Sequence, residues 1–119
     1  MIIKKQWGSE EVIANNDLYC AKYMLLAKQC RCSYHYHKVK DETFYIVVGE
    51  VLMVIEGSQK VMRPGDSVRI MPKQKHSFTG LEHSQILEVS THDEADDSYR
   101  DDKSRRLDDD EFGQITVLR

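Results

Sequence analysis

The sequence contains no long apolar run and no excess of positive charge, and these two absences exclude broad classes of partner. No stretch approaches the roughly 18 consecutive apolar residues that a membrane-spanning helix needs, and the first residues do not form the apolar core of a secretion signal. The formal net charge is −3, so a nucleic acid would meet no basic surface. We therefore expect a cytoplasmic protein that binds small molecules and neither membranes nor nucleic acids.

Cysteine is also scarce, and the three that occur do not follow the pattern of a metal or disulfide site. The number is odd, and the Cys-x-Cys pair lacks both a second pair and the two-residue gap of a zinc knuckle. We interpret Cys20, Cys30 and Cys32 as reduced thiols, because free cysteine commonly serves as a small buried hydrophobic residue.

The remaining composition is that of one globular domain, with 119 residues of which 40% are hydrophobic and 31% charged. Between Glu10 and Val89, short apolar or alternating runs are separated by Gly, Asn, Asp and Pro, a pattern typical of an all-β sandwich or barrel. No segment has the pattern of an amphipathic helix. The expected strands are 11–14, 18–27, 32–37, 43–48, 51–56, 59–62, 67–71, 76–78 and 85–90, with Thr79-Gly80 among the turns.

The segment 92–111 differs from the rest of the chain, because half of its twenty residues are acidic. A run of charge is typical of a solvated tail. Tyr99 and the arginines Arg100, Arg105 and Arg106 indicate instead that part of the segment docks on the domain. After it, residues 114–119 alternate in a β-like manner, which predicts an added edge strand.

Four residues have the spacing of a metal site. His35 and His37 stand at positions i and i+2, so on a strand both imidazoles project from the same face. Glu42 begins an apolar strand on the inward parity, where an acid is costly unless it is paired or binds a cation. His76 opens another strand and could supply a third imidazole. Three His and one Glu suit one divalent ion of Zn, Fe, Mn, Ni or Co better than Mg or Ca.

The same residues resemble the motifs of the cupin superfamily. His35-x-His37, Glu42 and Gly49 keep the spacing of its first motif, although the glycine that begins that motif is missing. Gly65 and the histidine eleven residues later keep the spacing of the second, whose final Asn is replaced by a glycine. The resemblance implies a single double-stranded β-helix, or jelly-roll barrel, over residues 1–119, with 92–111 as an acidic, arginine-containing C-terminal segment. It also implies a homodimer, since small cupins often pair.

A narrower resemblance, from Trp7 to about Leu107, is to the cupin domain of type II mannose-6-phosphate isomerases. The matching features are Trp7-Gly8, Lys22, Ser33 before the His-x-His motif, Glu88-Val89 and residues 96–100. This resemblance implies a metal-dependent aldose–ketose isomerase that acts on a sugar or a sugar phosphate. Arg100 matches an arginine of the acidic loop in this family, and Arg105 or Arg106 matches a second one only loosely. The family's Arg after the second His is replaced here by Lys38.

Several polar residues are candidates for roles in catalysis or substrate binding. Glu88 lies within an apolar strand, where burial would raise its pKa toward that of a general base; the alternative is a structural carboxylate paired with Lys22 or an arginine. Lys22 and Lys38 are candidates for proton shuttling or for binding substrate oxygens, and Ser33 for contacting substrate. Arg100 is the candidate for binding phosphate or carboxylate, because a guanidinium forms two parallel hydrogen bonds with such anions.

Two other functions use the same ligand set. One is a non-catalytic metal-binding cupin that holds a sugar or a small acid, because a fold does not fix a function. The other is an iron-dependent dioxygenase with O₂ at an open coordination position. Iron content and oxygen uptake would distinguish the dioxygenase from the isomerase.

Overall fold

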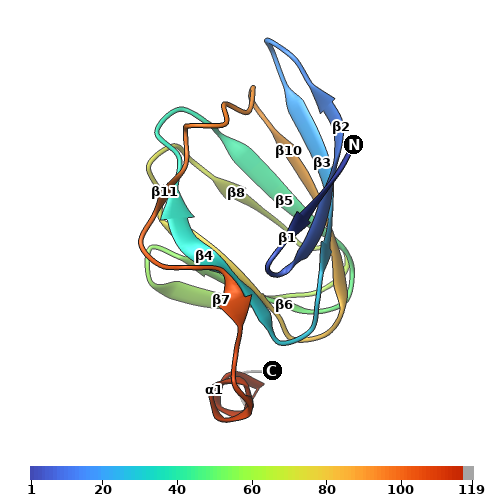
Figure 1. The fold of residues 1–119 in the computed structure, drawn as a ribbon, viewed down its shortest axis with the longest axis vertical. Helices are drawn as coiled ribbons and strands as arrows, with labels where there is room; N and C mark the ends of the chain where they lie inside the picture. Colours follow the sequence, from blue (N-terminus) through green and yellow to red (C-terminus); the bar gives the residue numbers. More distant parts are fainter. Residues whose placement is uncertain (117–119) are drawn as a thin grey trace.

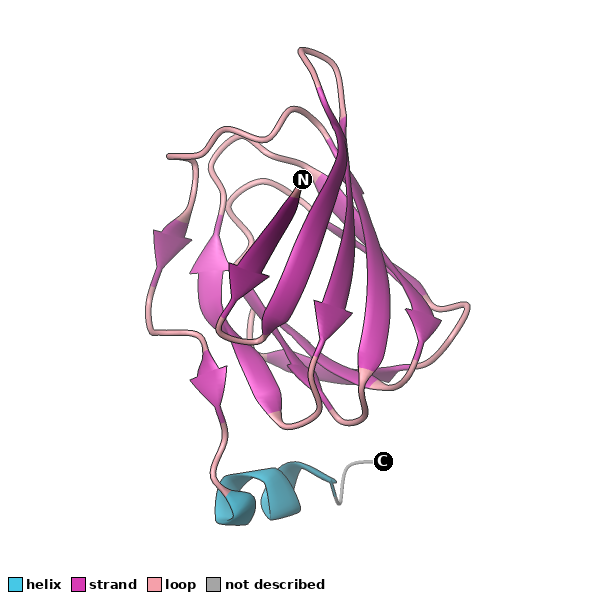
Figure 2. Cartoon of the chain, turned by 45° about the vertical axis from the view of Figure 1, so that its right-hand side comes forward, coloured by secondary structure: helices cyan, strands magenta, loops and turns pink. Residues whose placement is uncertain are grey.

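The chain folds as two antiparallel sheets that face each other and form a barrel, as Figures 1 and 2 show. A computed structural model of the protein describes residues 1–116. The predicted all-β jelly-roll fold is confirmed. No helix within the described residues is long and apolar enough to cross a membrane.

The first sheet has six strands. In spatial order they are β1 (Ile2–Lys5), β2 (Gly8–Asn15), β3 (Cys20–Leu26), β10 (Ser84–Ser90), β5 (Glu42–Val48) and β8 (Ser67–Ile70).

The second sheet packs opposite the first. Its order is β11 (Tyr99–Arg100), β4 (Cys30–Tyr36), β9 (His76–Gly80), β6 (Val51–Ile55) and β7 (Ser58–Met62), and β12 (Arg105–Arg106) also pairs with β4. A short helix, α1 (Asp109–Thr116), follows β12 and lies apart from the barrel in Figure 1.

The barrel interior is divided between an apolar core and a polar end. Alternate residues of the central strands point inward, because side chains of a strand alternate between its faces. Phe44, Ile46 and Met24 are buried in this way, and the ring of Trp7 packs edge-on against Phe78 at 5.4 Å between centroids. Toward the other end the same inward positions carry His, Glu and Lys. The three cysteines are free and buried, as predicted.

The acidic segment is docked and is not a free tail. The backbone of Tyr99–Arg100 pairs with β4 opposite Tyr36 and His35, and Arg105–Arg106 pairs farther along the same strand. The side chain of Leu107 is fully buried. This segment, 92–107, therefore runs along the edge strand β4 and closes one side of the barrel (Figure 1).

Two local predictions are wrong. Gly80 does not form a turn but continues β9, where a side chain would meet the Ala27 carbonyl oxygen at 2.6 Å from its Cβ. Residues 114–116 end a helix and are not part of an edge strand, and 117–119 lie outside the described residues. The helix begins because Asp108 and Glu111 cap it reciprocally: the amide of Glu111 donates to Asp108 Oδ1 at 2.8 Å, and the amide of Asp108 donates to Glu111 Oε1 at 3.3 Å.

Candidate metal centre

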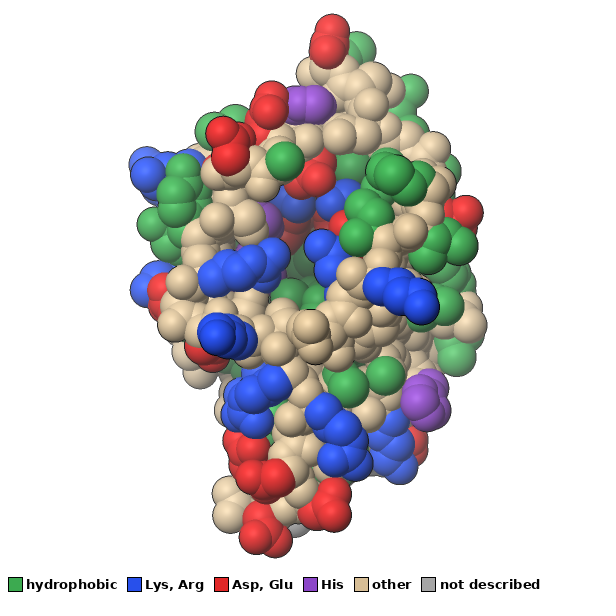
Figure 3. All heavy atoms as spheres, viewed as in Figure 1, with side chains coloured by type: hydrophobic (Ala, Val, Ile, Leu, Met, Phe, Trp, Pro, Cys, Tyr) green, Lys and Arg blue, Asp and Glu red, His purple; other side chains and the backbone are tan. Residues whose placement is uncertain are grey.

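A cavity of about 270 Å³ opens into the polar end of the barrel. Figure 3 shows the hollow, with basic and acidic side chains inside it. Its lining comes from both sheets and from the docked segment, which contributes Asp93, Glu94, Ala95, Ser98 and Arg100. A cavity of this size suits one sugar unit or a similar small molecule better than a polymer.

Three histidines meet beside this cavity, and two of them, His35 and His37, line it. His35 lies on β4, and His37 is the first residue after that strand. His76 opens β9 directly opposite His35 in the sheet register. One ring nitrogen from each residue lies within 4.8 Å of the others, and all three side chains are buried. The predicted grouping of His35, His37 and His76 is therefore present, and this group could hold a divalent ion.

The hydrogen bonds of the three rings leave the same nitrogen free on each. His35 Nδ1 lies 2.6 Å from the Ser33 carbonyl oxygen, His37 Nδ1 lies 2.6 Å from the Asp97 carbonyl oxygen, and His76 Nδ1 lies 3.0 Å from the Gln74 carbonyl oxygen. A carbonyl only accepts, so each Nδ1 carries the proton and donates. Each Nε2 then keeps its lone pair, which is the orientation that metal-binding histidines commonly have.

The electrostatics of the site keep the imidazoles of His35 and His37 neutral. Burial, followed by the neighbouring His76, lowers the pKa of His35 to about 3. Burial and the charge of Lys40 likewise lower the pKa of His37. Neutral imidazole is the form that binds metal ions.

Glu42 lies beside the three rings, as predicted. Its Oε1 is 3.0 Å from His76 Nε2, and its Oε2 is 3.8 Å from His37 Nε2. Within the described part of the chain, Glu42 Oε2 and His76 Nε2 are the fully buried side-chain polar atoms without a hydrogen-bond partner. Buried polar atoms are rarely left in this state. Two such atoms at one point, with three imidazole lone pairs, fit a bound cation.

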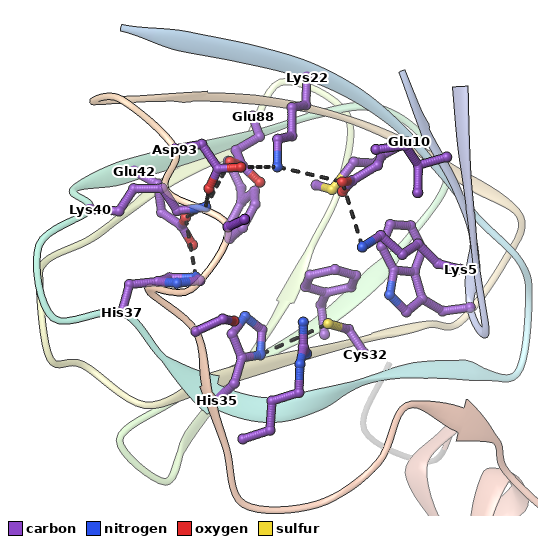
Figure 4. A pocket seen from close by; sticks show the side chains of 18 of the residues that line it. Lys5, Glu10, Lys22, Cys32, His35, His37, Lys40, Glu42, Glu88 and Asp93 are labelled. Atoms are coloured by element: carbon purple, nitrogen blue, oxygen red, sulfur yellow. Dashed lines mark hydrogen bonds and ion pairs between the residues drawn. The ribbon is translucent and has the colours of Figure 1, made fainter. Parts of the chain in front are cut away.

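A chain of alternating charges forms the opposite wall (Figure 4). Lys40 Nζ lies 3.0 Å from Glu42 Oε2, 3.3 Å from Glu88 Oε2 and 3.1 Å from Asp93 Oδ1. Asp93 also binds Lys22 at 2.8 Å, and Lys22 contacts Glu10 at 3.5 Å. Glu42 is therefore connected to the docked segment through one buried ammonium group.

Glu88 combines burial with an unusual pKa. Burial, and then the negative charge of Glu42, raises its pKa to about 7, although Lys40 and Lys22 act in the opposite direction. Glu42 differs: burial also raises its pKa, but His76 and the charge of Lys40 outweigh burial and hold the pKa below its usual value. Two carboxylates around one lysine thus have different proton affinities, an arrangement typical of acid–base sites.

The other predicted site residues separate into two groups. Arg100 lines the cavity and donates to Ser33 Oγ at 2.5 Å, and Lys22 also lines the cavity. Ser33 is fully buried behind Arg100 and supports it. Lys38 is not among the described residues that line the cavity, because its ammonium lies 4.4 Å above the ring of Tyr99.

Sequence reasoning missed three charged residues of this wall. Lys40 falls in a polar turn, Glu10 precedes a predicted strand, and Asp93 falls in the acidic run. Each is partnered by a residue distant in sequence, so no local pattern marked it. The one available signal was the pairing of Glu88 with some basic residue, and that residue is Lys40, not Lys22 or an arginine.

Comparison with known proteins agrees with this architecture. The model of the family described as "Cupin domain" matches residues 22–90, more than half of the chain. The pectin degradation protein KdgF of Dickeya dadantii is 28% identical over 53 residues, which are 44% of this chain and 48% of that protein. The chain thus matches about half the length of this curated relative.

Solved structures share the fold. KdgF from Halomonas sp. superposes with a TM-score of 0.70 at 20% identity, covering 74% of this chain and 81% of the other. Pac13, a nucleoside dehydratase from Streptomyces, superposes with a TM-score of 0.75 at 12% identity, covering 93% and 89%. From the family match, the two-sheet barrel and the position of the three histidines inside it, the chain belongs to the cupin family.

Proposed function

We propose that this cupin is a metal-dependent enzyme that transfers a proton on a small, anionic derivative of a sugar. The observation that carries the proposal is the presence of Glu88, a buried carboxylate with a raised pKa, in the same cavity as His35 and His37. A buried carboxylate with a raised proton affinity beside a charge partner in a cavity is typical of acid–base sites.

The metal ligands in this proposal are His35, His37, His76 and Glu42. The three Nε2 lone pairs and the Glu42 carboxylate supply the mixed nitrogen and oxygen donors that Zn, Mn, Fe, Ni or Co accept. A bound divalent ion would act as a Lewis acid on a substrate carbonyl and its neighbouring hydroxyl.

Glu88 is the general base of the proposal. It would take a proton from the carbon next to the carbonyl and, in an isomerisation, return it to the former carbonyl carbon, while the proton of the neighbouring hydroxyl moves to the former carbonyl oxygen. Lys40 orients this carboxylate at 3.3 Å. Lys22 lies one ion pair farther away, on the other side of Asp93, and its charge also acts to lower the pKa of Glu88.

Arg100 binds the charged group of the substrate. It comes from the docked segment, is held by Ser33, and reaches the cavity beside His35. A guanidinium binds either a carboxylate or a phosphate through two parallel hydrogen bonds. Both kinds of sugar therefore remain within the proposal: a sugar phosphate, as the resemblance to mannose-6-phosphate isomerases implies, and a carboxylated sugar of the kind that pectin breakdown yields.

Aldose–ketose isomerisation is the specific reaction that we favour within this class. It needs one base, one electrophile and a binding site for an anion, and the cavity has residues suited to each of these roles. A lyase reaction on a carboxylated sugar would begin with the same proton abstraction. The products decide between the two.

The test is a substrate panel followed by NMR in deuterated water. The protein is loaded with Zn, Mn, Co, Ni or Fe(II) in turn and incubated with mannose 6-phosphate, fructose 6-phosphate, galacturonate and neutral glucose. Metal-dependent conversion of an anionic sugar, with deuterium entering beside the carbonyl, is the expected result. Interconversion of the two sugar phosphates would establish the isomerase.

Matched variants connect turnover to the site. Glu88→Gln keeps the shape of the base but removes its proton affinity, so it should abolish deuterium entry while the protein still binds metal. Binding without turnover in the metal-loaded wild type would favour the non-catalytic cupin. Oxygen uptake with Fe(II) would favour the dioxygenase, and either result would overturn the proposal.

A further inference from the structure

We infer that Asp97 is a positioning residue for the metal site, and that through it metal binding is coupled to docking of the segment 92–107. The inference rests on the proposed metal site and adds to it a residue outside the ligand set. It concerns a part of the chain that follows the matched cupin domain, which ends at residue 90.

The first contact is made by the backbone of Asp97. Its carbonyl oxygen accepts the Nδ1 proton of His37 at 2.6 Å, and both residues are buried. This hydrogen bond fixes the tautomer of His37 and the rotation of its ring, so that Nε2 faces His35 and His76. The rings of His35 and His76 are oriented by Ser33 and Gln74, each two residues away in the chain. His37 alone of the three depends on a residue 60 positions away.

The second contact is made by the side chain of Asp97. One carboxylate oxygen accepts the amide of Lys38 at 2.8 Å, and the other accepts the amides of Val39 and Lys40 at 3.1 Å each. These three residues connect His37 to the strand that begins with Glu42. The carboxylate therefore anchors the turn between two of the metal ligands.

These hydrogen bonds also set the charge of Asp97. Burial raises its pKa, but the three amide donors outweigh burial and lower the pKa below its usual value, so the group is a carboxylate near neutral pH. A carboxylate that accepts several amide protons forms stronger bonds than a neutral acceptor would.

Asp97 is joined to the barrel by further contacts on both sides. Before it, Asp93 forms ion pairs with Lys22 and Lys40. After it, the Asp101 amide donates to the Tyr34 carbonyl oxygen at 2.8 Å, and Leu107 is fully buried. The position of Asp97 thus depends on docking of the whole segment. Because coupling between two binding events is reciprocal, metal binding must strengthen docking as much as docking strengthens metal binding.

The experiment measures Zn²⁺ affinity by competition with a chromophoric chelator, and coordination by the visible spectrum of the Co²⁺ form. Asp97→Ala keeps the backbone carbonyl that accepts from His37 but removes the carboxylate that anchors the turn. The carbonyl should then no longer be held against His37, so Zn²⁺ binding should weaken by about 10- to 100-fold and the Co²⁺ spectrum should change. Asp97→Asn, which keeps one acceptor oxygen, should lie between this variant and the wild type.

Asp102→Ala is the matched control. Asp102 lies in the same segment and its carboxylate also accepts a backbone amide, that of Tyr34 at 2.7 Å, but it contacts no ligand histidine. We expect this variant to weaken Zn²⁺ binding less than Asp97→Ala does, because it loosens docking without releasing the turn that follows His37, and to keep the wild-type Co²⁺ spectrum. Equal effects in the Ala variants of Asp97 and Asp102 would overturn the inference. Absence of Zn²⁺ binding by the wild type would instead overturn the proposed metal site itself.

Hydrogen exchange on the wild type tests the inference without any variant. Zn²⁺ should slow exchange at the amides of residues 38–40 and at Asp97 and Asp101 more than at the other end of the barrel, where the amides of Ala27 and Leu81 donate to the carbonyl oxygens of Trp7 and Glu50. Equal slowing in both regions would mean that metal stabilises the fold as a whole, and would contradict a specific coupling to the docked segment.

Discussion

Lys40 and Glu88 form a buried ion pair, with Nζ 3.3 Å from Oε2 and side chains that are 4% and 6% exposed. The same ammonium group also contacts Glu42 and Asp93. One lysine therefore compensates the charge of a metal ligand, of the proposed base and of the docked segment. Burying these carboxylates without it would be costly, since an uncompensated charge is poorly solvated in the protein interior.

Replacing this lysine tests its central position in the network. Lys40→Met should lower the free energy of unfolding by about 3–5 kcal/mol, the usual cost of removing one partner from a buried ion pair. Chemical denaturation of the metal-free protein measures the loss. Lys38→Met is the control, because its exposed cation–π contact with Tyr99 contributes only about 0.5–1 kcal/mol. Similar losses in the two variants would contradict the central role of Lys40.

The pH dependence of activity should follow Glu88. Burial raises its pKa to about 7, and a base must be ionised to accept a proton. Turnover should therefore fall about tenfold per pH unit below about 7 and level off above it. A pH profile of kcat/KM on the substrate found above measures this. A profile with no inflection between pH 6 and 8 would remove Glu88 from the role of base.

The ionisation of Glu88 should affect stability in the opposite direction: turnover rises with pH, whereas the free energy of unfolding falls. Because the pKa of Glu88 in the folded state is above its usual value near 4.5, its contribution is most favourable below pH 4.5 and is lost as the pH rises through about 7. Glu88→Gln should thus be less destabilising at pH 8 than at pH 5. Urea denaturation of the metal-free protein at both pH values checks this, and a larger loss at pH 8 would contradict it.

The central strands and the clustering of the proposed metal ligands were predictable from the sequence because both follow local rules. Alternation of inward and outward side chains marked β4 and β5, and the His-x-His spacing placed two ligands on one face. Glu42 stood out as an acid on an apolar face. Lys40 gave no such signal, because its partners Glu88 and Asp93 are brought to it only by the folded sheet and the docked segment.

The C-terminal end was predicted poorly for a different reason. Residues 114–116 were expected to extend as a strand, since Ile115 begins an alternating pattern, but they complete a helix. The capping pair of Asp108 and Glu111 was visible in the sequence as an Asp-x-x-Glu spacing, yet it was hidden within a run of acidic residues. No residue of Asp109–Thr116 is buried. The helix therefore has no buried apolar face whose pattern in the sequence could have predicted it.

Metal binding should stabilise the wild type and leave a ligand variant unchanged. A ligand that binds only the folded state at 100 times its Kd adds about 2.7 kcal/mol, so Zn²⁺ should raise the melting temperature of the wild type. His76→Ala removes a fully buried ligand and should abolish the increase. Thermal unfolding with Zn²⁺ and with excess chelator measures both. His83→Ala, in a loop away from the three histidines, is the control and should retain the full increase.

Arg100 should decide between charged and neutral substrates. Its guanidinium lines the cavity, and Ser33 holds it there. A hydrogen bond to a charged group contributes about 1.5–3 kcal/mol, so Arg100→Ala should lower kcat/KM for an anionic sugar by about 10- to 100-fold. The neutral sugar should be affected little. Arg106→Ala, whose guanidinium lies 3.8 Å from Asp109 and is largely exposed, should change neither value. The contrary outcome is that Arg100→Ala lowers kcat/KM equally for the anionic and the neutral sugar. That result would mean that the arginine supports the docked segment and does not recognise the anion. The proposal of an anionic substrate would then lose its main support.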